Sequence, residues 1–116
     1  MDTTTARKRL EEIRSELERS ISVLKGDQQQ QERSRDYPQD PADAGANLSE
    51  TDRSEAILAA ARRQRSQVLD ALRRIDLGTY GTCVDCGASV PEGRLEAKPE
   101  AARCVKCQGK LDRLRR

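Results

Sequence analysis

Two pairs of cysteines in the last third of the chain constrain its fold most strongly. Each pair encloses two residues, and seventeen residues separate the pairs, whose members are Cys83, Cys86, Cys104 and Cys107. This spacing lets one tight turn direct two sulfur atoms at a metal about 2.3 Å away, and the second pair completes a tetrahedron. Because four thiolates leave no open coordination position, the pattern predicts one structural Zn²⁺ and no hydrolytic site.

Other interpretations of the cysteines have less support. Iron in a rubredoxin-like site stays open, because tetrahedral sulfur suits both metals. Two disulfides require an oxidising compartment, and no apolar run is long enough for a signal peptide or a membrane span. A thioredoxin-like redox pair requires a βαβ pattern, which is absent, and oxidation sensing has no support beyond the cysteines themselves. We therefore expect a cytoplasmic protein with reduced thiols and no membrane contact.

The composition argues against a large globular core. Of the 116 residues, 34% are apolar and 36% are charged, and Phe, Trp and His are absent. Typical chains are about 45–50% apolar and about 25% charged, and small cores often need a metal as a staple. The lack of histidine removes the commonest general base, so we expect no enzymatic activity. Charge is unevenly distributed, with six acidic and one basic residue in 36–55 but three acidic and eight basic residues in 94–116.

Apolar residues spaced three and four apart predict two long amphipathic helices. The first is expected to begin near Ala6 and to continue through the polar residues 28–35. The second is expected to follow a capping box with Ser49 as N-cap and to end near Leu77. The expected stripes are Ala6, Leu10, Ile13, Leu17, Ile21 and Leu24 in the first helix, and Ile57, Ala61, Val68, Leu72 and Ile75 in the second, with Leu58 and Leu69 on its flank.

Two arms of about 28 residues with a turn between them favour a long antiparallel helical hairpin, in a mainly α fold. Proline and glycine place the turn at residues 36–48. We expect residues 1–77 to form this hairpin, with the turn as its tip, and residues 78–116 to form a four-cysteine zinc finger and a short terminal helix. A helix pair completed by dimerisation is the alternative, although we expect a monomer.

Within the predicted finger, Gly78 and Gly81 suit the end of a helix and the entry into the first cysteine turn. We expect Tyr80 to pack over the metal site rather than to stack on a ligand. A small ribbon or turn within residues 88–99 is expected to pack there too, through Val90, Leu95 and Ala97. Residues 108–116 are expected to form a short basic helix whose Leu111 and Leu114 fold back on the base of the hairpin.

Further residues around the cysteines form a recognisable pattern, which is Gly78-x-Tyr80-Gly81-x-Cys83-x-x-Cys86-Gly87, Val90, Arg94-Leu95-x-Ala97-Lys98-Pro99 and Cys104-x-x-Cys107. The pattern resembles the C4-type zinc finger of the DksA/TraR family of bacterial transcription regulators over about residues 78–107. The resemblance implies a partner, RNA polymerase, whose secondary channel receives a long coiled coil. It also implies that no direct sequence-specific DNA binding takes place.

The resemblance further implies that acidic residues at the coiled-coil tip reach the catalytic centre of the polymerase and alter initiation. The family tip pattern Asp-x-x-Asp-x-Ala is matched by Asp40 and Asp43, whereas Gly45 replaces the alanine. The candidate partner-binding residues at the tip are therefore Asp40, Asp43, Ala44 and Gly45. The alternative is that the two aspartates only form the turn.

Arg94 and Lys98 are candidates for an effector or polymerase contact. Family members that respond to the alarmone ppGpp use basic residues on the second helix and on the finger. Lys98 is suitably basic, but Gln64 and Gln67 on the helix are not. We therefore do not assume a response to ppGpp.

Two other functions compete with polymerase binding. A nucleic-acid-binding zinc module is suggested by Arg113, Arg115 and Arg116 at the end of the chain, although no aromatic platform is available for stacking bases. The second alternative is a structural or self-associating coiled coil without a polymerase partner.

Overall fold

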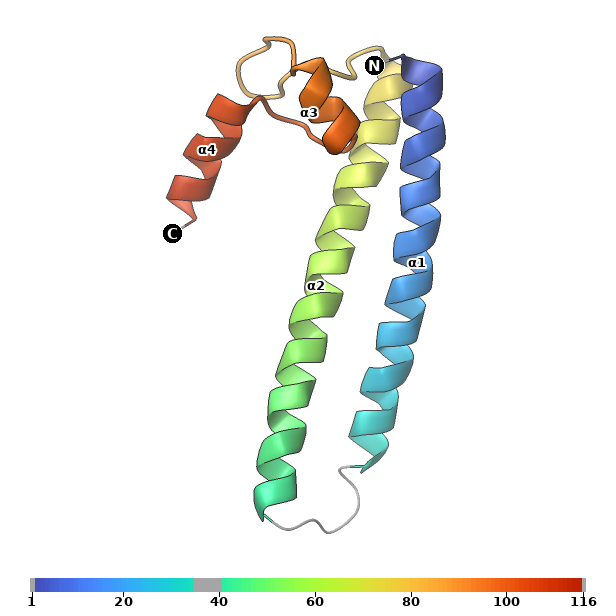
Figure 1. The fold of residues 1–116 in the computed structure, drawn as a ribbon, viewed down its shortest axis with the longest axis vertical. Helices are drawn as coiled ribbons and strands as arrows, with labels where there is room; N and C mark the ends of the chain where they lie inside the picture. Colours follow the sequence, from blue (N-terminus) through green and yellow to red (C-terminus); the bar gives the residue numbers. More distant parts are fainter. Residues whose placement is uncertain (1, 35–40, 116) are drawn as a thin grey trace. The chain divides into compact units, whose positions relative to one another are not determined.

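The computed structural model is helical, and Figure 1 shows its four helices in order along the chain. It describes the backbone of residues 2–34 and 41–115, and the side chains of residues 2–26 and 52–115. The helices are α1 (Thr3–Ser34), α2 (Pro41–Leu77), α3 (Glu92–Ala97) and α4 (Val105–Leu114). Within the described residues, β structure is limited to one isolated antiparallel bridge between Thr82 and Ser89. The mainly α fold predicted from the sequence is thereby confirmed.

The chain forms two compact units. One contains Met1–Arg14 and Ser66–Arg116, and the other contains Ser15–Arg65. The first unit therefore joins the start of α1, the end of α2 and all of the cysteine-containing segment. The second unit contains the remaining parts of α1 and α2. The domain boundary at residues 77 and 78 stays a prediction.

Helix α1 forms along the predicted apolar stripe. Ala6 and Leu10 are fully buried, and Ile13 and Ile21 are nearly so. The helix continues beyond Gly26 to Ser34, as expected from the sequence. Its first turn is capped by Asp2, whose carboxylate accepts hydrogen bonds from the Thr4 backbone N–H and the Thr5 hydroxyl, both at 3.2 Å. The first of these bonds satisfies one of the backbone donors that a helix start leaves without partners.

Helix α2 begins at Pro41, eight residues before the predicted start at Ser49. The predicted boundary was therefore wrong, and Ser49 lies inside the helix. Proline is well suited to the first turn of a helix, because the N–H that it lacks would have no helical partner there. The Ser-x-x-Asp pattern at residues 49–52 does not mark the start of this helix, because an N-cap residue has a non-helical backbone and Ser49 is helical.

The buried face of α2 differs by one residue from the predicted face at its start. Leu58 is 3% exposed, whereas Ile57 is 49% exposed. Starting from Leu58, positions 58, 61, 65, 68, 72 and 75 alternate at three and four residues, which is a heptad seam. The seam was hard to recognise because Arg65, which is half-buried, occupies one of its positions.

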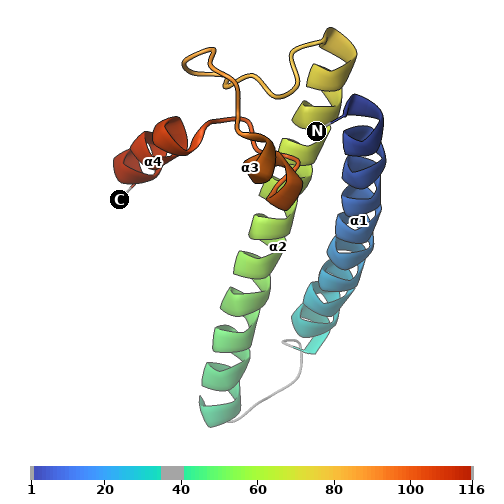
Figure 2. The same cartoon turned by 45° about the horizontal axis from the view of Figure 1, so that its top comes forward.

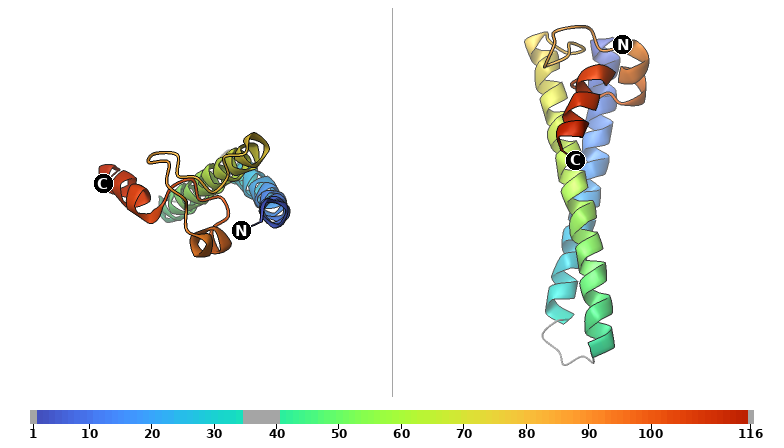
Figure 3. Two further views of the ribbon diagram at one scale, coloured as in Figure 1. Left: turned by 90° about the horizontal axis from the view of Figure 1, so that it is seen from above. Right: turned by 90° about the vertical axis from the view of Figure 1, so that its left-hand side faces the viewer.

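In the first unit, the start of α1 and the end of α2 lie side by side, as the two views of Figure 3 show. Val68 and Ala71 are fully buried, and Leu72 is 8% exposed. At the edge of this packing, a guanidinium nitrogen of Arg7 lies 2.5 Å from Oδ1 of Asp76. That hydrogen bond raises the pKa of Arg7 above its ordinary value. The ion pair joins residues 69 positions apart and marks the antiparallel register of the two segments.

Helix α2 ends in a Schellman motif. Gly78 has a φ of +78°, a conformation that glycine adopts without a Cβ clash. The Thr79 N–H donates to the Arg74 carbonyl at 2.9 Å, and the Gly78 N–H donates to the Ile75 carbonyl at 3.2 Å. These two bonds satisfy carbonyls that the helix end would otherwise leave free. The predicted role of this glycine is confirmed, and the chain turns there into the cysteine-containing segment (Figure 2).

The terminal helix differs from its prediction in two ways. Helix α4 begins at Val105 rather than at residue 108, so that it includes Cys107. Leu114 is 83% exposed and does not fold back on the hairpin base, while Leu111 is half-buried. A ten-residue helix anchored at its first turn leaves its last residue beyond the packed surface, which explains the exposed leucine.

Candidate metal centre

A short hairpin presents the first cysteine pair. The Cys83 N–H donates to the Ala88 carbonyl at 2.8 Å, and the Gly87 N–H donates to the Cys83 carbonyl at 3.0 Å. Gly87 has a φ of +76°, which allows the chain to reverse directly after Cys86. These bonds close the turn around the two intervening residues, and both sulfur atoms are thereby directed to one side.

The start of α4 presents the second pair. Cys104 is the N-cap residue of the helix, and Cys107 lies in its first turn. The Gln108 N–H donates to the Cys104 carbonyl at 2.9 Å, which closes that turn. The N-terminus of a helix carries a partial positive charge, so this position favours thiolate over thiol.

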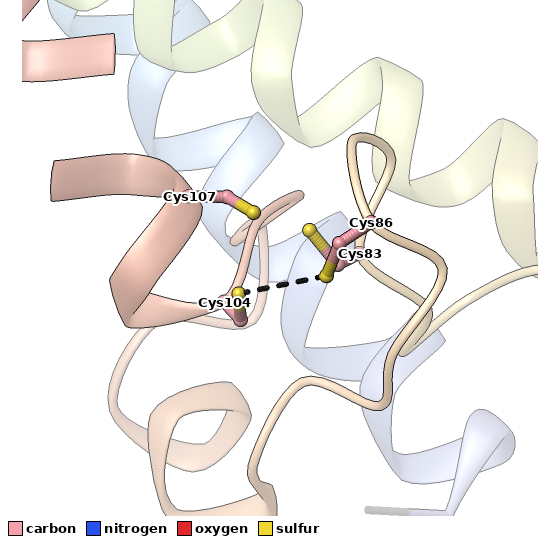
Figure 4. A group of neighbouring side chains, drawn as sticks. All are labelled: Cys83, Cys86, Cys104 and Cys107. Atoms are coloured by element: carbon pink, nitrogen blue, oxygen red, sulfur yellow. Dashed lines mark hydrogen bonds between the residues drawn. The ribbon is translucent and has the colours of Figure 1, made fainter. Parts of the chain in front are cut away.

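The four sulfur atoms converge, as Figure 4 shows. All of them lie within 4.8 Å of one another, and the Sγ atoms of Cys86 and Cys104 are 3.9 Å apart. Four sulfurs at about 2.3 Å from one zinc ion stand roughly 3.8 Å apart, so the cluster fits that ion. No disulfide joins these four cysteines. The predicted metal ligands are thus brought together in a geometry suited to one metal ion.

Hydrogen bonding within the cluster separates the thiol pKa values. Hydrogen bonds from backbone N–H groups, that of Cys104 first and that of Cys86 second, lower the pKa of Cys83 to about 6. The backbone N–H of Cys107 lowers the pKa of Cys104. The hydrogen bond between the Cys104 and Cys107 side chains raises the pKa of Cys107 to about 12. Four thiols this close cannot all ionise without a cation, and a divalent metal supplies the charge that allows it.

A small apolar core supports the cysteines. Val90 and Leu95 are 5% and 4% exposed, and Ala101 is 6% exposed. Tyr80 packs against this core, as predicted, and its hydroxyl donates to the Pro99 carbonyl at 3.0 Å. The remaining members of the core are Cys83 and Cys107, and the partly buried Cys104 packs against it. The predicted packing of Val90 and Leu95 is confirmed.

Ala97, in contrast, is exposed, so its predicted packing against the metal site was wrong. It lies in α3, whose buried residue is Leu95. Residues 95 and 97 point about 200° apart on a helix, because each residue advances by about 100°. One short helix cannot bury both against the same core, and the larger Leu95 takes the buried position.

Polar contacts that the sequence did not predict join the two cysteine pairs. The Arg103 Nε donates to Oδ2 of Asp85 at 2.7 Å, and the Arg94 Nε donates to the Arg103 carbonyl at 3.0 Å. The Val84 N–H also donates to the Ala102 carbonyl at 3.0 Å. Asp85 lies between the first two cysteines and Arg103 directly precedes the third, so this clasp fixes one pair against the other. The sequence did carry a signal for this contact, because an acidic residue lies within the first cysteine pair and a basic residue lies directly before the second.

A polar cavity of about 100 Å³ lies in the same unit and contains both predicted contact residues. Lys98 is exposed and Arg94 is half-buried. The Arg74 Nε is buried and has no hydrogen-bond partner in the described part of the chain. Burial lowers the pKa of Arg74. The residues that line the cavity are Gln67, Asp70, Arg74, Arg94, Lys98, Glu100, Ala101, Ala102, Arg103 and Gln108.

The predicted tip residues stand apart from this centre in the chain. Asp40 lies outside the described residues. Asp43, Ala44 and Gly45 lie in the first turns of α2, and their side chains are outside the described set. Their role as a partner-binding tip therefore stays a prediction. None of the described helices is long and apolar enough to cross a membrane.

Comparison with known proteins relates this chain to a family. Residues 78–113 match the prokaryotic dksA/traR C4-type zinc finger. The RNA polymerase-binding transcription factor DksA of Caulobacter vibrioides is 37% identical over 70 residues, which cover 59% of this chain and 49% of the relative. DksA of Escherichia coli K12 is 25% identical over 97 residues, which cover 84% of this chain and 60% of the relative. The matched region thus spans about half the length of these curated relatives.

The fold is similar to a solved structure as well. The structure of transcription factor DksA2 from Pseudomonas aeruginosa aligns with a TM-score of 0.79, at 24% sequence identity, over 97% of this chain and 84% of that one. The likeness supports the helical fold, while the match over residues 78–113 contains all four clustered cysteines. Residues 78–113 therefore match the DksA/TraR C4-type zinc finger, and the chain is similar to DksA proteins over part of their length.

Proposed function

We propose that the protein is a zinc-dependent, non-enzymatic transcription regulator that binds RNA polymerase. The observation that carries the proposal is the complete four-cysteine centre inside a DksA/TraR finger. The Caulobacter vibrioides and Escherichia coli relatives are named RNA polymerase-binding transcription factors. The four sulfur ligands fill the coordination shell of a zinc ion, so the metal would order the finger and would leave no position for a substrate.

In this proposal the acidic end of the helical pair enters the secondary channel of the polymerase and modulates initiation. Residues 36–55 carry six acidic side chains against one basic one. Carboxylates on a narrow helical end can pair with basic side chains in a channel or approach a hard cation such as Mg²⁺. Asp40 and Asp43 are the proposed contacts, with Ala44 and Gly45 beside them. We also propose that the protein acts in the cytoplasm as a monomer.

The test uses purified RNA polymerase, full-length zinc-loaded protein and transcription from several promoters. The Asp40→Ala/Asp43→Ala variant is expected to bind the polymerase but to lose most of the effect on transcript yield. The Glu11→Ala/Glu18→Ala variant removes the same charge from two exposed side chains of α1, outside the acidic segment 36–55, and is the matched control. If both variants act like the parent protein, the tip has no role. If the parent does not bind the polymerase at all, the proposed function is wrong.

A self-associating coiled coil is the second candidate, and one observation in the second unit favours it. Val23 is 64% exposed and Ile57 is 49% exposed. Both line an apolar groove of about 600 Å³ that Glu16, Arg19, Ser20 and Leu24 complete. Sedimentation equilibrium decides between the two candidates, because a monomer at micromolar concentration is incompatible with a stable dimer. Substituting Val23→Ser should dissociate a dimer formed through this groove and should leave a monomer unchanged.

A further inference from the structure

Three basic side chains form a line on α4 that the proposed function does not use. Lys106, Lys110 and Arg113 are exposed and follow one another at four and three residues. Residues at this spacing lie on one face of a helix, here about 6 Å and about 4.5 Å apart along the axis. None of the three forms an ion pair within the part of the chain that the structure describes. We call this line the basic stripe.

The helix keeps its acidic residue away from the basic stripe. Asp112 is the one carboxylate in the α4 sequence, and its Oδ1 accepts a hydrogen bond from Nε2 of Gln108 at 3.0 Å. At about 100° per residue, position 112 points about 160° away from Lys110 and about 120° away from Lys106. Asp112 is nearer to Arg113, at about 100°, but it is paired with Gln108, so the three positive charges of the basic stripe have no ion-pair partner on the described helix.

The negative charge of a zinc–tetrathiolate centre does not account for the whole stripe. Lys106 lies between two metal ligands and can offset that charge. Lys110 and Arg113 lie about 6 Å and about 10.5 Å further along the axis. Exposed charges separated by more than about 8 Å are largely screened at physiological salt. The negative charge of the metal site therefore does not explain why Arg113 lies on this face.

A metal ion bound by the four cysteines would hold the basic stripe in a fixed orientation. Cys104 occupies the N-cap position of α4, and Cys107 in the first turn is 9% exposed. Both would be bonded to the metal, so the start of the helix would be anchored at two points. A rigid helix loses little conformational entropy when it binds, which favours a partner with regularly spaced charges.

The residue types of the stripe point to phosphate rather than to a protein surface. Lysine supplies two of the three charges, and lysine is depleted in protein–protein interfaces. Duplex nucleic acid carries one negative charge per about 1.7 Å of its axis, so each basic side chain can reach a phosphate. Helix α4 contains no Phe, Trp or Tyr, so the stripe has no aromatic neighbour on its own helix with which to stack on bases.

We infer that the basic stripe of α4 binds the phosphate backbone of duplex nucleic acid without reading its sequence. The contact goes beyond the proposed polymerase binding and does not depend on it. It also agrees with the expectation that the protein lacks direct sequence-specific DNA binding. Three phosphate contacts give weak affinity alone, so the stripe would act when another interaction has already brought the protein close to DNA.

The test is fluorescence anisotropy of a labelled 24-base-pair duplex, titrated with full-length zinc-loaded protein between about 50 and 200 mM KCl. Three neutralised phosphates predict a logarithmic salt slope of about −2.7, which is roughly a 40-fold loss of affinity over this range. The Lys106→Gln/Lys110→Gln/Arg113→Gln variant should lose most of the binding at low salt and most of the slope. Two duplexes of unrelated sequence should bind equally.

The matched control is Lys8→Gln/Arg19→Gln/Lys25→Gln, which removes the same charge from exposed residues of α1. Equal losses in the two triple variants would show a general charge effect and would overturn the inference. So would a stripe variant that binds DNA normally but no longer binds RNA polymerase, because the face would then serve a protein. Loss of polymerase binding in the tip variant, with DNA binding unchanged, affects only the proposed function.

Discussion

The hydroxyl of Tyr80 donates a hydrogen bond to the carbonyl oxygen of Pro99, 3.0 Å away and nineteen residues later in the chain. This bond joins the segment before the first cysteine pair to the segment before the second. The ring packs on the core formed by Val90, Leu95 and Ala101. One side chain therefore supports the metal site by packing and satisfies a carbonyl of buried Pro99 at the same time.

Replacing Tyr80→Phe keeps the ring and removes the hydrogen bond, which should cost about 1 kcal/mol in the free energy of unfolding. Burial raises the pKa of Tyr80. The folded state therefore keeps the phenol proton to a higher pH than the unfolded state. This contribution is complete below the ordinary pKa of about 10 and is lost as the pH rises beyond it. Urea unfolding at pH 7 and pH 10.5 should show a larger pH-dependent loss in the parent than in the Phe variant, and equal losses would contradict this.

The register of α2 gives a second prediction, from two adjacent residues. Leu58→Ala should destabilise the helical pair by about 2–5 kcal/mol, because Leu58 is 3% exposed and leaves a cavity. Ile57→Ala should cost about 1 kcal/mol or less, since half of that side chain is already in solvent. Thermal and urea unfolding of both variants measure the difference. Similar costs would mean that the seam runs between the two residues rather than through Leu58.

These neighbours show what periodicity can and cannot determine. The existence of two amphipathic helices followed from the three- and four-residue spacing alone. The choice between Ile57 and Leu58 did not follow from the spacing, because both are apolar. Position 65, which is seven residues after Leu58 and would have indicated its face, holds an arginine. Arg65 keeps an aliphatic stem that can lie along an apolar seam while its charged end reaches water, and a pattern of hydrophobic residues does not register it.

The metal centre was predictable for a different reason. Two residues separate the cysteines of each pair, and this short spacing alone places both sulfur atoms of a pair within reach of one metal ion. The clasp between Asp85 and Arg103 depends on how two turns eighteen residues apart are placed, and local sequence does not fix that. The exposure of Leu114 likewise follows from where α4 is anchored rather than from its own amphipathic pattern.

Removing zinc should unfold the finger and leave the long helices largely intact. Helices α3 and α4 have six and ten residues. Isolated helices shorter than about 12–15 residues are marginal in water, and the supporting core is small. Chelation should therefore reduce far-UV circular dichroism by no more than the share of α3 and α4. A loss of most helical signal would show that α1 and α2 depend on the metal, and an unchanged signal would show that the finger does not.

The clasp should slow the loss of the metal. The Asp85 and Arg103 side chains are 47% and 29% exposed, so their ion pair contributes at most about 1 kcal/mol. Asp85→Asn should therefore speed zinc release to a coloured chelator by up to about fivefold, with a smaller effect at high salt. Glu12→Gln breaks the exposed pair between Arg9 and Glu12 and is the control. Equal release rates in both variants would mean that the ion pair between Asp85 and Arg103 does not help to retain the metal.

The thiol pKa values predict how zinc binding depends on pH. A hydrogen bond within the cluster raises the pKa of Cys107 to about 12, so this thiol keeps its proton at pH 7 without metal. Backbone N–H groups lower the pKa of Cys83 to about 6, so that thiol is already ionised at pH 7. Because zinc binds thiolates, its binding must release at least the Cys107 proton, and affinity must rise with pH.

Below about pH 6 Cys83 also takes up a proton, so one more proton is released per zinc and affinity falls more steeply as the pH falls. Calorimetry in two buffers of different ionisation enthalpy counts the released protons at pH 7. The Cys107→Ser variant has no thiol proton to release at that position, and its count should be lower by about one if it still binds zinc. Equal heats in both buffers for the parent protein would mean that the four sulfurs are already ionised before the metal arrives, against the mutual repulsion of charges this close together.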